Sequence, residues 1–311
     1  MPATAAQTQE KPYSYWREVR RRLWRSRSAR IGLTIIAVEL IIAFVGPLLM
    51  VYDPIDYRDP NNKVRTPPCI HLLGCPSDQP EHIFGLDSNG RDLFSRVVNA
   101  TRVSLFIGVV TVTFGIVVGT LIGGLSGFVG GWVDNVFMRS MDVLLAFPSL
   151  LLAIVLVAIL RALIVSGTIS PLFPALFAIG VLAIPHYARI VRSTVLQVRE
   201  QDFVHADRAL GASQARLLFH RILPNSLTPL MVAGTLGVAT AILEAAALGF
   251  LGLGQQPPYP EWGTMLGVER SSVINAPHLL IFPGVAIMIT VLAFNLVGDG
   301  LRDALDPRLY R

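Results

Sequence analysis

Long runs of hydrophobic residues, separated by short polar segments, dominate the chain. Five runs contain no Asp, Glu, Lys or Arg: residues 103–133, 143–160, 162–188, 222–243 and 271–298. A sixth run, residues 31–51, holds one charge, Glu39. Because roughly 20 apolar residues in a helix cross the hydrocarbon core of a bilayer, each run is long enough to form a transmembrane helix.

The runs predict helices, because a backbone in lipid must satisfy its own hydrogen bonds and the ~10-residue alternation of a membrane barrel is absent. We therefore expect an all-α membrane protein with six transmembrane helices. Their approximate limits are residues 31–52, 102–128, 136–162, 172–193, 226–254 and 278–299.

The composition supports this class, and the charges predict the orientation. Of the 311 residues, 52% are hydrophobic and only 15% are charged, against about 25% charged in soluble domains. Basic residues concentrate in cytoplasmic segments, and an inside N-terminus places 18 of the 26 Lys and Arg residues there. This predicts a cytoplasmic basic segment (1–30), an extracytoplasmic loop (53–101), a cytoplasmic C-terminus (300–311) and a multi-pass protein of the plasma membrane with both termini inside.

The basic N-terminal segment contains the stretch YSYWREVRRRLWRSRSAR. Trp16, Val19 and Leu23 recur there at helical spacing among arginines, which suits a helix lying in the lipid headgroup layer. Simple positive flanking charge is the alternative. The hydrophobic run that follows is too long for a cleaved signal peptide and lacks a small-residue cleavage site.

The two cysteines, Cys69 and Cys75, both fall in the predicted extracytoplasmic loop. In an oxidising compartment they could close a small ring, worth about 2 kcal/mol through loop entropy. Two reduced thiols are the alternative. No familiar zinc-ligand spacing is completed by His71 and His82, so we expect no metal site.

The chain lacks the motifs of the common catalytic classes. Its two lysines, Lys11 and Lys63, do not follow a phosphate-binding glycine loop, and neither a G-x-S-x-G nor an H-E-x-x-H motif occurs. We therefore expect no enzyme and no ATPase site of its own, which leaves transport, channel or scaffold roles.

Glycines, acids and prolines in the predicted helices indicate close helix packing, candidate functional positions and kinks. A glycine stripe at four-residue spacing lets a second helix approach closely, either from this chain or from another subunit; it comprises Gly115, Gly119, Gly123, Gly127 and Gly131. A charge in the membrane usually faces a cavity or a partner, so Glu39 and Glu244 are both candidate functional residues. For Glu244 we expect a place on the transport pathway or at a subunit boundary, with a structural role as the alternative. Pro185 and Pro283 predict kinks, either mobile or static.

One basic, helix-forming stretch interrupts the apolar pattern: HADRALGASQARLLFHRILPNSLTP, from His205. A short helix with acids in its first turns is expected before Gly211, which can stop it in the left-handed conformation. Ser213 can then cap a second helix that bears Leu217, Leu218 and Ile222. The stretch predicts a helix-glycine-helix elbow whose small residues permit docking against another protein.

This stretch resembles the cytoplasmic EAA loop of ABC importer permeases. Ala206, Gly211 and the Leu223-Pro224 pair match the pattern, whereas His205 stands for its glutamate, Asp207 for its second alanine and Arg221 for a later isoleucine. Four further stretches resemble the second, C-type permease subunit of dipeptide and oligopeptide importers, over about residues 20–311. They are FGLDSNGRDLFSRVVNATRVSL, DNVFMRSMDVLLAFPSLLLAI, LGFLGLGQQPPYPEWGTML and FPGVAIMITVLAFNLVGDGLRDALDPR.

The resemblance implies a type I ABC importer permease fold with its core at residues 102–299 and a coupling loop at 194–225. It implies a homologous second permease, two cytoplasmic ATPase subunits that bind ATP and Mg, and an extracytoplasmic peptide-binding protein; no nucleic acid and no cofactor on this chain are expected. The residues implied in ATPase coupling are Asp202, Phe203, His205, Ala206, Asp207, Arg208, Ala209, Leu210, Gly211 and Ala212.

The function implied is import of di- or oligopeptides by alternating access. The same architecture could carry a nickel chelate, glutathione or another small solute. The alternative from a different functional class is a self-sufficient channel or secondary transporter. Such proteins show internal repeats with interrupted helices, which this sequence lacks.

Overall fold

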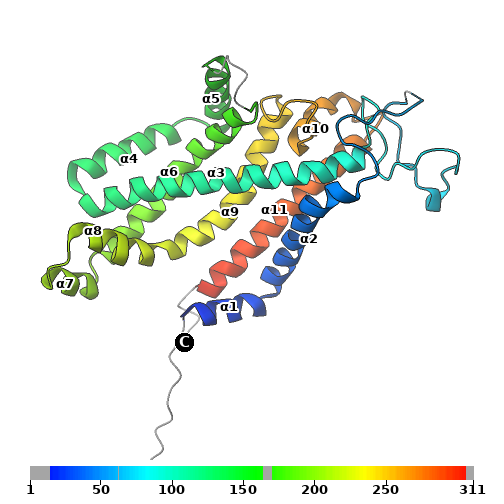
Figure 1. The fold of residues 1–311 in the computed structure, drawn as a ribbon. Helices are drawn as coiled ribbons and strands as arrows, with labels where there is room; N and C mark the ends of the chain where they lie inside the picture. Colours follow the sequence, from blue (N-terminus) through cyan, green and yellow to red (C-terminus); the bar gives the residue numbers. More distant parts are fainter. Residues whose placement is uncertain (1–14, 62, 164–169, 306–311) are drawn as a thin grey trace, which may run out of the picture.

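The computed structural model describes residues 15–61, 63–163 and 170–305, and this part of the chain is built almost wholly of helices (Figure 1). The predicted all-α fold is confirmed. The α-helices are α1 (Tyr15–Arg25), α2 (Arg27–Leu49), α3 (Leu93–Val129), α4 (Gly131–Leu145), α5 (Ser149–Leu163), α6 (Phe173–Val198), α7 (Asp202–Ala209), α8 (Gln214–Arg216), α9 (Leu223–Phe250), α10 (Trp262–Val268) and α11 (His278–Leu305).

Five of the six predicted spans are confirmed as helices long and apolar enough to cross a membrane. They are α2, α3, α6, the continuous stretch Gln214–Phe250 and α11. Pro185 and Pro283 lie inside α6 and α11, which continue through them. The tail arginines Arg308 and Arg311 and the N-terminal Lys11 lie outside the described residues.

The third predicted span, residues 136–162, is broken. The chain forms α4 and α5 there instead of one straight helix; the two are bent by 96°, and only taken together do they have the length and composition of a sixth span. The break falls at Pro148, which lacks an amide hydrogen and disfavours helical geometry at Phe147 before it. Each piece has 15 residues, about 22 Å at 1.5 Å per residue, which is shorter than a hydrocarbon core.

The second span begins earlier than predicted, because Asp92 caps it. The Asp92 carboxylate accepts a hydrogen bond from the Ser95 amide at 2.7 Å and starts α3 at Leu93. The ring of His82 lies 2.9 Å from the other carboxylate oxygen. The helix therefore projects beyond the predicted membrane segment and anchors the loop that precedes it.

The glycine stripe of α3 packs against α6 of the same chain, which decides between the two alternatives. A Cβ added at Gly119 would lie 2.8 Å from the Tyr187 Cβ, and one at Gly127 would lie 2.9 Å from the Arg192 carbonyl oxygen. At Gly115 and Gly123 the collisions would be with Ala183 and Ala188. The two backbones therefore approach closely, and any larger side chain would separate them.

Gly131 does not belong to this stripe, and that part of the prediction is wrong. The helix α3 ends at Val129, and Gly130 and Gly131 turn the chain into α4 with φ angles of 71° and 59°. A Cβ at Gly131 would have nothing within 4 Å. The glycine is therefore explained by the turn, since positive φ is costly for other residues.

The first span, α2, packs beside α11. A Cβ at Gly32 would lie 2.6 Å from the Ala293 carbonyl oxygen, and the Thr290 hydroxyl lies 2.7 Å from Oε1 of Glu39. Glu39 is buried at this contact. Its observed partner is therefore a neighbouring helix of the same chain.

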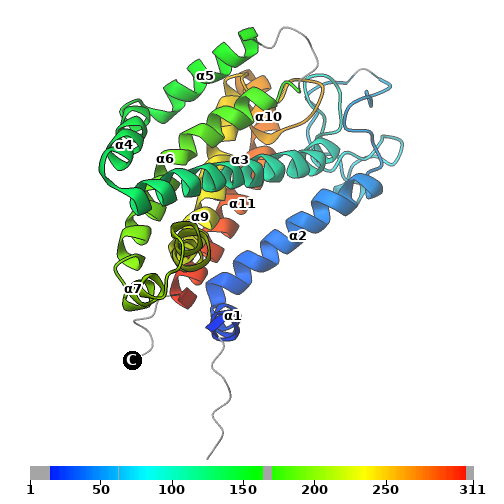
Figure 2. The ribbon, with the colours of Figure 1, turned by 60° about the vertical axis from the view of Figure 1, so that its left-hand side comes forward.

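The bundle has two distinct ends. Figures 1 and 2 show α1, α7 and the end of α11 at one, which we call the elbow end, and α10 with the long loop (residues 50–92) at the other, the loop end. At the elbow end, Val19 of α1 is buried with Ala304 and Leu305 of α11. The N-terminal segment thus forms the predicted helix, anchored by its apolar face.

Candidate functional site

The elbow, which we define as residues 201–213, joins α6 to the helix that becomes α9. After α7, Ser213 accepts a hydrogen bond from the Arg216 amide and caps the next helix, as predicted. That helix begins as α8, passes through a π-helical segment (Leu217–Ile222) and continues as α9. Pro224, within the first turn of α9, lacks an amide hydrogen, which a wider π turn can accommodate.

Gly211 ends α7 in the left-handed conformation, with a φ angle of 85°. This confirms the conformation predicted for it. A Cβ placed at Gly211 would meet nothing within 4 Å. The position therefore requires glycine because of its backbone angle and not because of crowding.

The elbow presents nearly all of its side chains to solvent. Among the ten residues implied in coupling, Asp207 and Ala212 are half-buried and the others are exposed; Leu210 is 86% exposed. Val204, which was not among the ten, is fully buried and anchors α7 to the hydrophobic core. The structure thus separates one anchoring residue from a surface open to a partner.

An ion pair closes the elbow. Nε of Arg221, in the π-helical segment, lies 2.7 Å from Oδ2 of Asp207 in α7, and a second guanidinium nitrogen lies 3.4 Å from Oδ1. These two residues depart from the EAA pattern, and the structure brings them together. Two opposite charges on either side of the glycine that ends the helix were a signal in the sequence for this contact. The pair itself was not predicted from the sequence.

A cavity of about 680 Å³ lies beside the two helices that flank the elbow, α6 and α9. Its lining on α9 extends from Pro229 to Glu244, about 22 Å along the helix axis. The wall is mostly apolar. Its polar side chains are Ser149, His186, Tyr187, Thr240, Glu244 and Arg302.

Glu244 lies on the wall of this cavity, half-buried, toward the loop end of α9. Within the described residues its carboxylate has no hydrogen bond or salt bridge, although it interacts electrostatically with Tyr187. The Tyr187 ring is 2% exposed, and its hydroxyl lies where a Cβ at Gly237 would collide with it. Sequence reasoning singled out Glu244 but missed His186 and Tyr187, which a helical register shared with Ala183 and Ile190 could have suggested.

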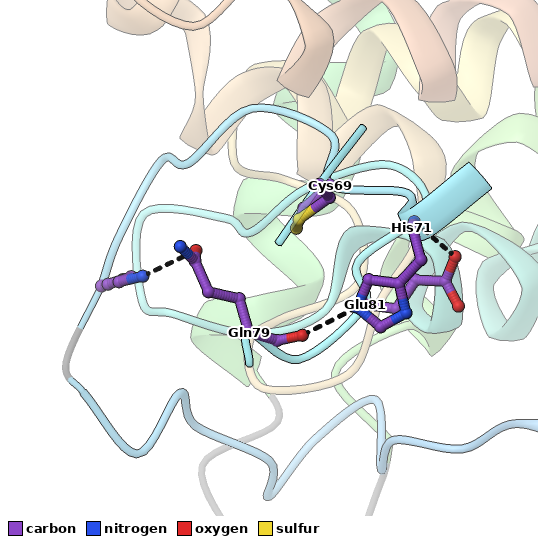
Figure 3. Close-up of a disulfide and its surroundings, with 6 residues drawn as sticks. Cys69, His71, Gln79 and Glu81 are labelled. Carbon is purple, nitrogen blue, oxygen red and sulfur yellow. Dashed lines mark hydrogen bonds between the residues drawn. A yellow bond between two sulfur atoms is a disulfide. The ribbon is translucent and has the colours of Figure 1, made fainter. Parts of the chain in front are cut away.

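The long loop carries a disulfide between Cys69 and Cys75, whose Cα atoms lie 5.3 Å apart (Figure 3). Beside the ring, the His71 amide donates to Glu81 at 3.2 Å, and the His71 imidazole lies 2.9 Å from the Gln79 carbonyl oxygen. The ring and these bonds fix the tip of the loop.

The base of the long loop is tied to the segment between α9 and α11 by buried charges. Glu269 accepts a hydrogen bond from the Ser88 amide at 3.0 Å, and Arg96 donates to the carbonyl oxygens of Pro54 and Pro258. Burial, with the charges of neighbouring groups, raises the pKa of Tyr57 to about 12, so its hydroxyl stays protonated beside His82, 3.5 Å away. The loop end is therefore an ordered surface held by hydrogen bonds and buried charges.

Two family models match the chain. The first describes a binding-protein-dependent transport system inner membrane component and matches residues 100–311. The second describes the N-terminal transmembrane domain of oligopeptide transport permease C and matches residues 14–68.

Curated relatives match over nearly the whole length. The chain is 45% identical over 296 residues to the dipeptide transport system permease protein DppC of Alkalihalophilus pseudofirmus, covering 95% of this chain and 91% of that protein. It is 42% identical over 294 residues to the glutathione transport system permease protein GsiD of Pectobacterium atrosepticum, covering 94% of this chain and 91% of that protein.

Solved structures share the fold. A chain of the MetNI methionine ABC transporter in an inward-facing conformation aligns with a TM-score of 0.56 and 23% identity, covering 69% of this chain and 98% of that chain. An amino acid ABC transporter chain aligns with a TM-score of 0.52 and 16% identity, covering 68% and 94%.

Proposed function

Because the chain belongs to the family of binding-protein-dependent transport system inner membrane components, we propose that it is the permease subunit of an ATP-driven importer of di- and oligopeptides. It is a multi-pass membrane protein and not itself an ATPase. The energy for transport is supplied by two partner ATPase subunits, which bind ATP and Mg.

The observation that carries this proposal is the position of the elbow. It connects α6 and α9 directly, and both helices line the cavity. A displacement of the elbow therefore moves two walls of the cavity at once. Val204 and the Asp207–Arg221 pair hold α7 to these helices, so that the elbow can move as a rigid unit.

The elbow end faces the cytoplasm, where the ATPase subunits dock on the exposed residues of α7. Closure of the ATPases displaces the elbow and changes which side of the membrane the cavity faces. Reversing such an equilibrium from 1:99 to 99:1 requires about 5.5 kcal/mol of differential interaction. A homologous second permease completes the cavity.

The loop end faces the outside and receives the peptide-binding protein. Its rigidity supports this role, because docking on an ordered surface costs less conformational entropy. The disulfide of the long loop is consistent with an oxidising extracytoplasmic compartment.

Peptide cargo is supported by the relative named as a dipeptide permease, at 45% identity. Glutathione is the second candidate, because relatives named as glutathione permeases match at 42% and 40% identity. Both cargoes are small peptides with a free α-ammonium group.

The test is uptake by proteoliposomes that contain the chain together with its permease and ATPase partners and an excess of the binding protein. We expect ATP-dependent uptake of a labelled dipeptide, in preference to glutathione, and none when this chain is omitted. Preferential uptake of glutathione would make glutathione, and not the dipeptide, the assigned cargo. Uptake without ATP would contradict the proposed function.

A further inference from the structure

The charges of the cavity are unevenly distributed. Among the described residues that line it, Glu244 is the one acid and lies toward the loop end, whereas Arg302 lines it from α11 near the elbow end and His186 lies on α6. The wall to which Glu244 belongs is largely apolar, with Val112, Ile179 and Ala241 among its lining residues. A carboxylate in such surroundings is costly unless a donor or a cation reaches it.

Within the described residues, no side chain supplies that partner. The Tyr187 hydroxyl interacts electrostatically with the carboxylate but is confined next to Gly237. The other intramembrane acid differs, because Oε1 of Glu39 accepts a hydrogen bond from the Thr290 hydroxyl, although its Oε2 is buried without a partner among the described residues. Glu244 is therefore the acid whose partner is left to come from the cavity.

A cargo peptide has the chemistry that fits this wall. Its α-ammonium group is a cation with three donors, and its side chains can lie on the apolar surface beside it. Hydrogen bonds between charged groups are shorter and about twice as strong as neutral ones. A solute without an amino group would leave the carboxylate unsatisfied.

We propose that the Glu244 carboxylate binds the α-ammonium group of the cargo as it passes through the cavity between α6 and α9. This rests on the proposed function, since it assumes that the cavity belongs to the transport pathway. It makes Glu244 a determinant of cargo chemistry within the membrane, in addition to selection by the binding protein.

The experiment places a thiol reporter next to Glu244 in the assembled complex. Thr240 lies one helical turn before Glu244 and lines the same cavity, and both native cysteines are bonded to each other. A Thr240→Cys complex in lipid nanodiscs is labelled with a maleimide in the presence of alanyl-alanine or N-acetyl-alanyl-alanine. We expect alanyl-alanine to half-protect the thiol at a concentration about tenfold lower than its acetylated counterpart, the factor for one charged hydrogen bond.

The second step adds Glu244→Gln to the reporter, which should abolish the difference between the two peptides. The matched control is Glu39→Gln, another intramembrane acid that lies on α2, away from this cavity; it should retain the difference. Equal protection by the two peptides, or a difference that persists in Glu244→Gln, would overturn the inference. Uptake of alanyl-alanine by the native complex is measured in parallel, and its absence would instead overturn the proposed function.

Discussion

Asp207 and Arg221 form an ion pair across the glycine that ends α7, with Oδ2 of the carboxylate 2.7 Å from Nε of the guanidinium. The pair joins the short helix of the elbow to the segment that leads into α9. Its side chains are 22% and 55% exposed, so its contribution to overall stability should be below about 1 kcal/mol. Its importance lies in fixing the orientation of α7.

We expect Asp207→Arg to reduce the amount of peptide imported per ATP hydrolysed, because two cations would then repel each other within the elbow. Exchanging both charges, with Asp207→Arg and Arg221→Asp together, should restore most of it. Because the contact is worth up to about 1 kcal/mol, its loss should lower the amount of peptide imported per ATP hydrolysed by up to about fivefold. The measurement is the ratio of uptake to ATP hydrolysis in proteoliposomes.

The control for this experiment is Glu200→Ala, which removes a pair with the adjacent Arg199 that does not bridge α7 to the π-helical segment. Its ratio should match that of the native complex. If the double exchange is no better than Asp207→Arg alone, the pair does not orient the elbow.

Gly123 tests the contact between α3 and α6. A Cβ there would collide with the Ala188 carbonyl oxygen, which belongs to a helical backbone and cannot rotate away. We expect Gly123→Ala to destabilise the bundle by roughly 1–3 kcal/mol through overpacking. Thermal unfolding in detergent reports this.

For comparison, Gly284 lies within α11, where a Cβ would meet nothing within 4 Å. Gly284→Ala should be neutral or slightly stabilising, since alanine favours a helix by up to about 1 kcal/mol. Equal effects of the two substitutions would show that close helix contact is not what Gly123 provides.

The disulfide of the long loop predicts the behaviour of its thiols. Without a reducing agent, Cys69 and Cys75 should both resist a maleimide, and reduction should expose two thiols per chain. Reduction opens the ring and removes about 2 kcal/mol of stabilisation, which comes from restricting the unfolded loop. Proteolysis of the long loop should therefore become faster after reduction. Labelling of the untreated protein would exclude the bond.

Much of the fold could be predicted because hydrophobic run length and glycine spacing act locally. The left-handed Gly211 and the cap at Ser213 followed from residues whose preferences are strong and short in range. The break at Pro148 does not follow from the length of the uncharged run, and its local signal is the proline itself, because a proline and the residue before it oppose a continuous helix. Gly131 continues the four-residue spacing of the stripe into a turn, so spacing alone assigns it to the wrong element.

The site was harder to predict, since its contacts join distant positions. Asp207 and Arg221 are 14 residues apart, and only the folded elbow brings them together. Glu39 and Glu244 look alike in the sequence, but the first meets Thr290, 251 residues away, whereas the second lines the cavity beside α6 and α9 and has no hydrogen bond within the described residues. Such differences depend on the partner that packing supplies and not on local propensity.

We propose that the elbow transmits the energy of ATP hydrolysis to the bundle. Gly211 offers the most direct test, because a β-branched residue in the left-handed conformation is strained by about 1–2 kcal/mol or more, whereas asparagine tolerates it. Gly252 provides a matched control at the loop end of α9, since it also has a positive φ angle, of 78°, and open space around it.

The deciding measurement is the ratio of peptide uptake to ATP hydrolysis in proteoliposomes containing assembled complexes. We predict that Gly211→Val loses uptake while hydrolysis continues, that Gly211→Asn remains close to the native ratio, and that Gly252→Val does too. A native ratio in a fully assembled Gly211→Val complex would show that the elbow does not transmit this energy.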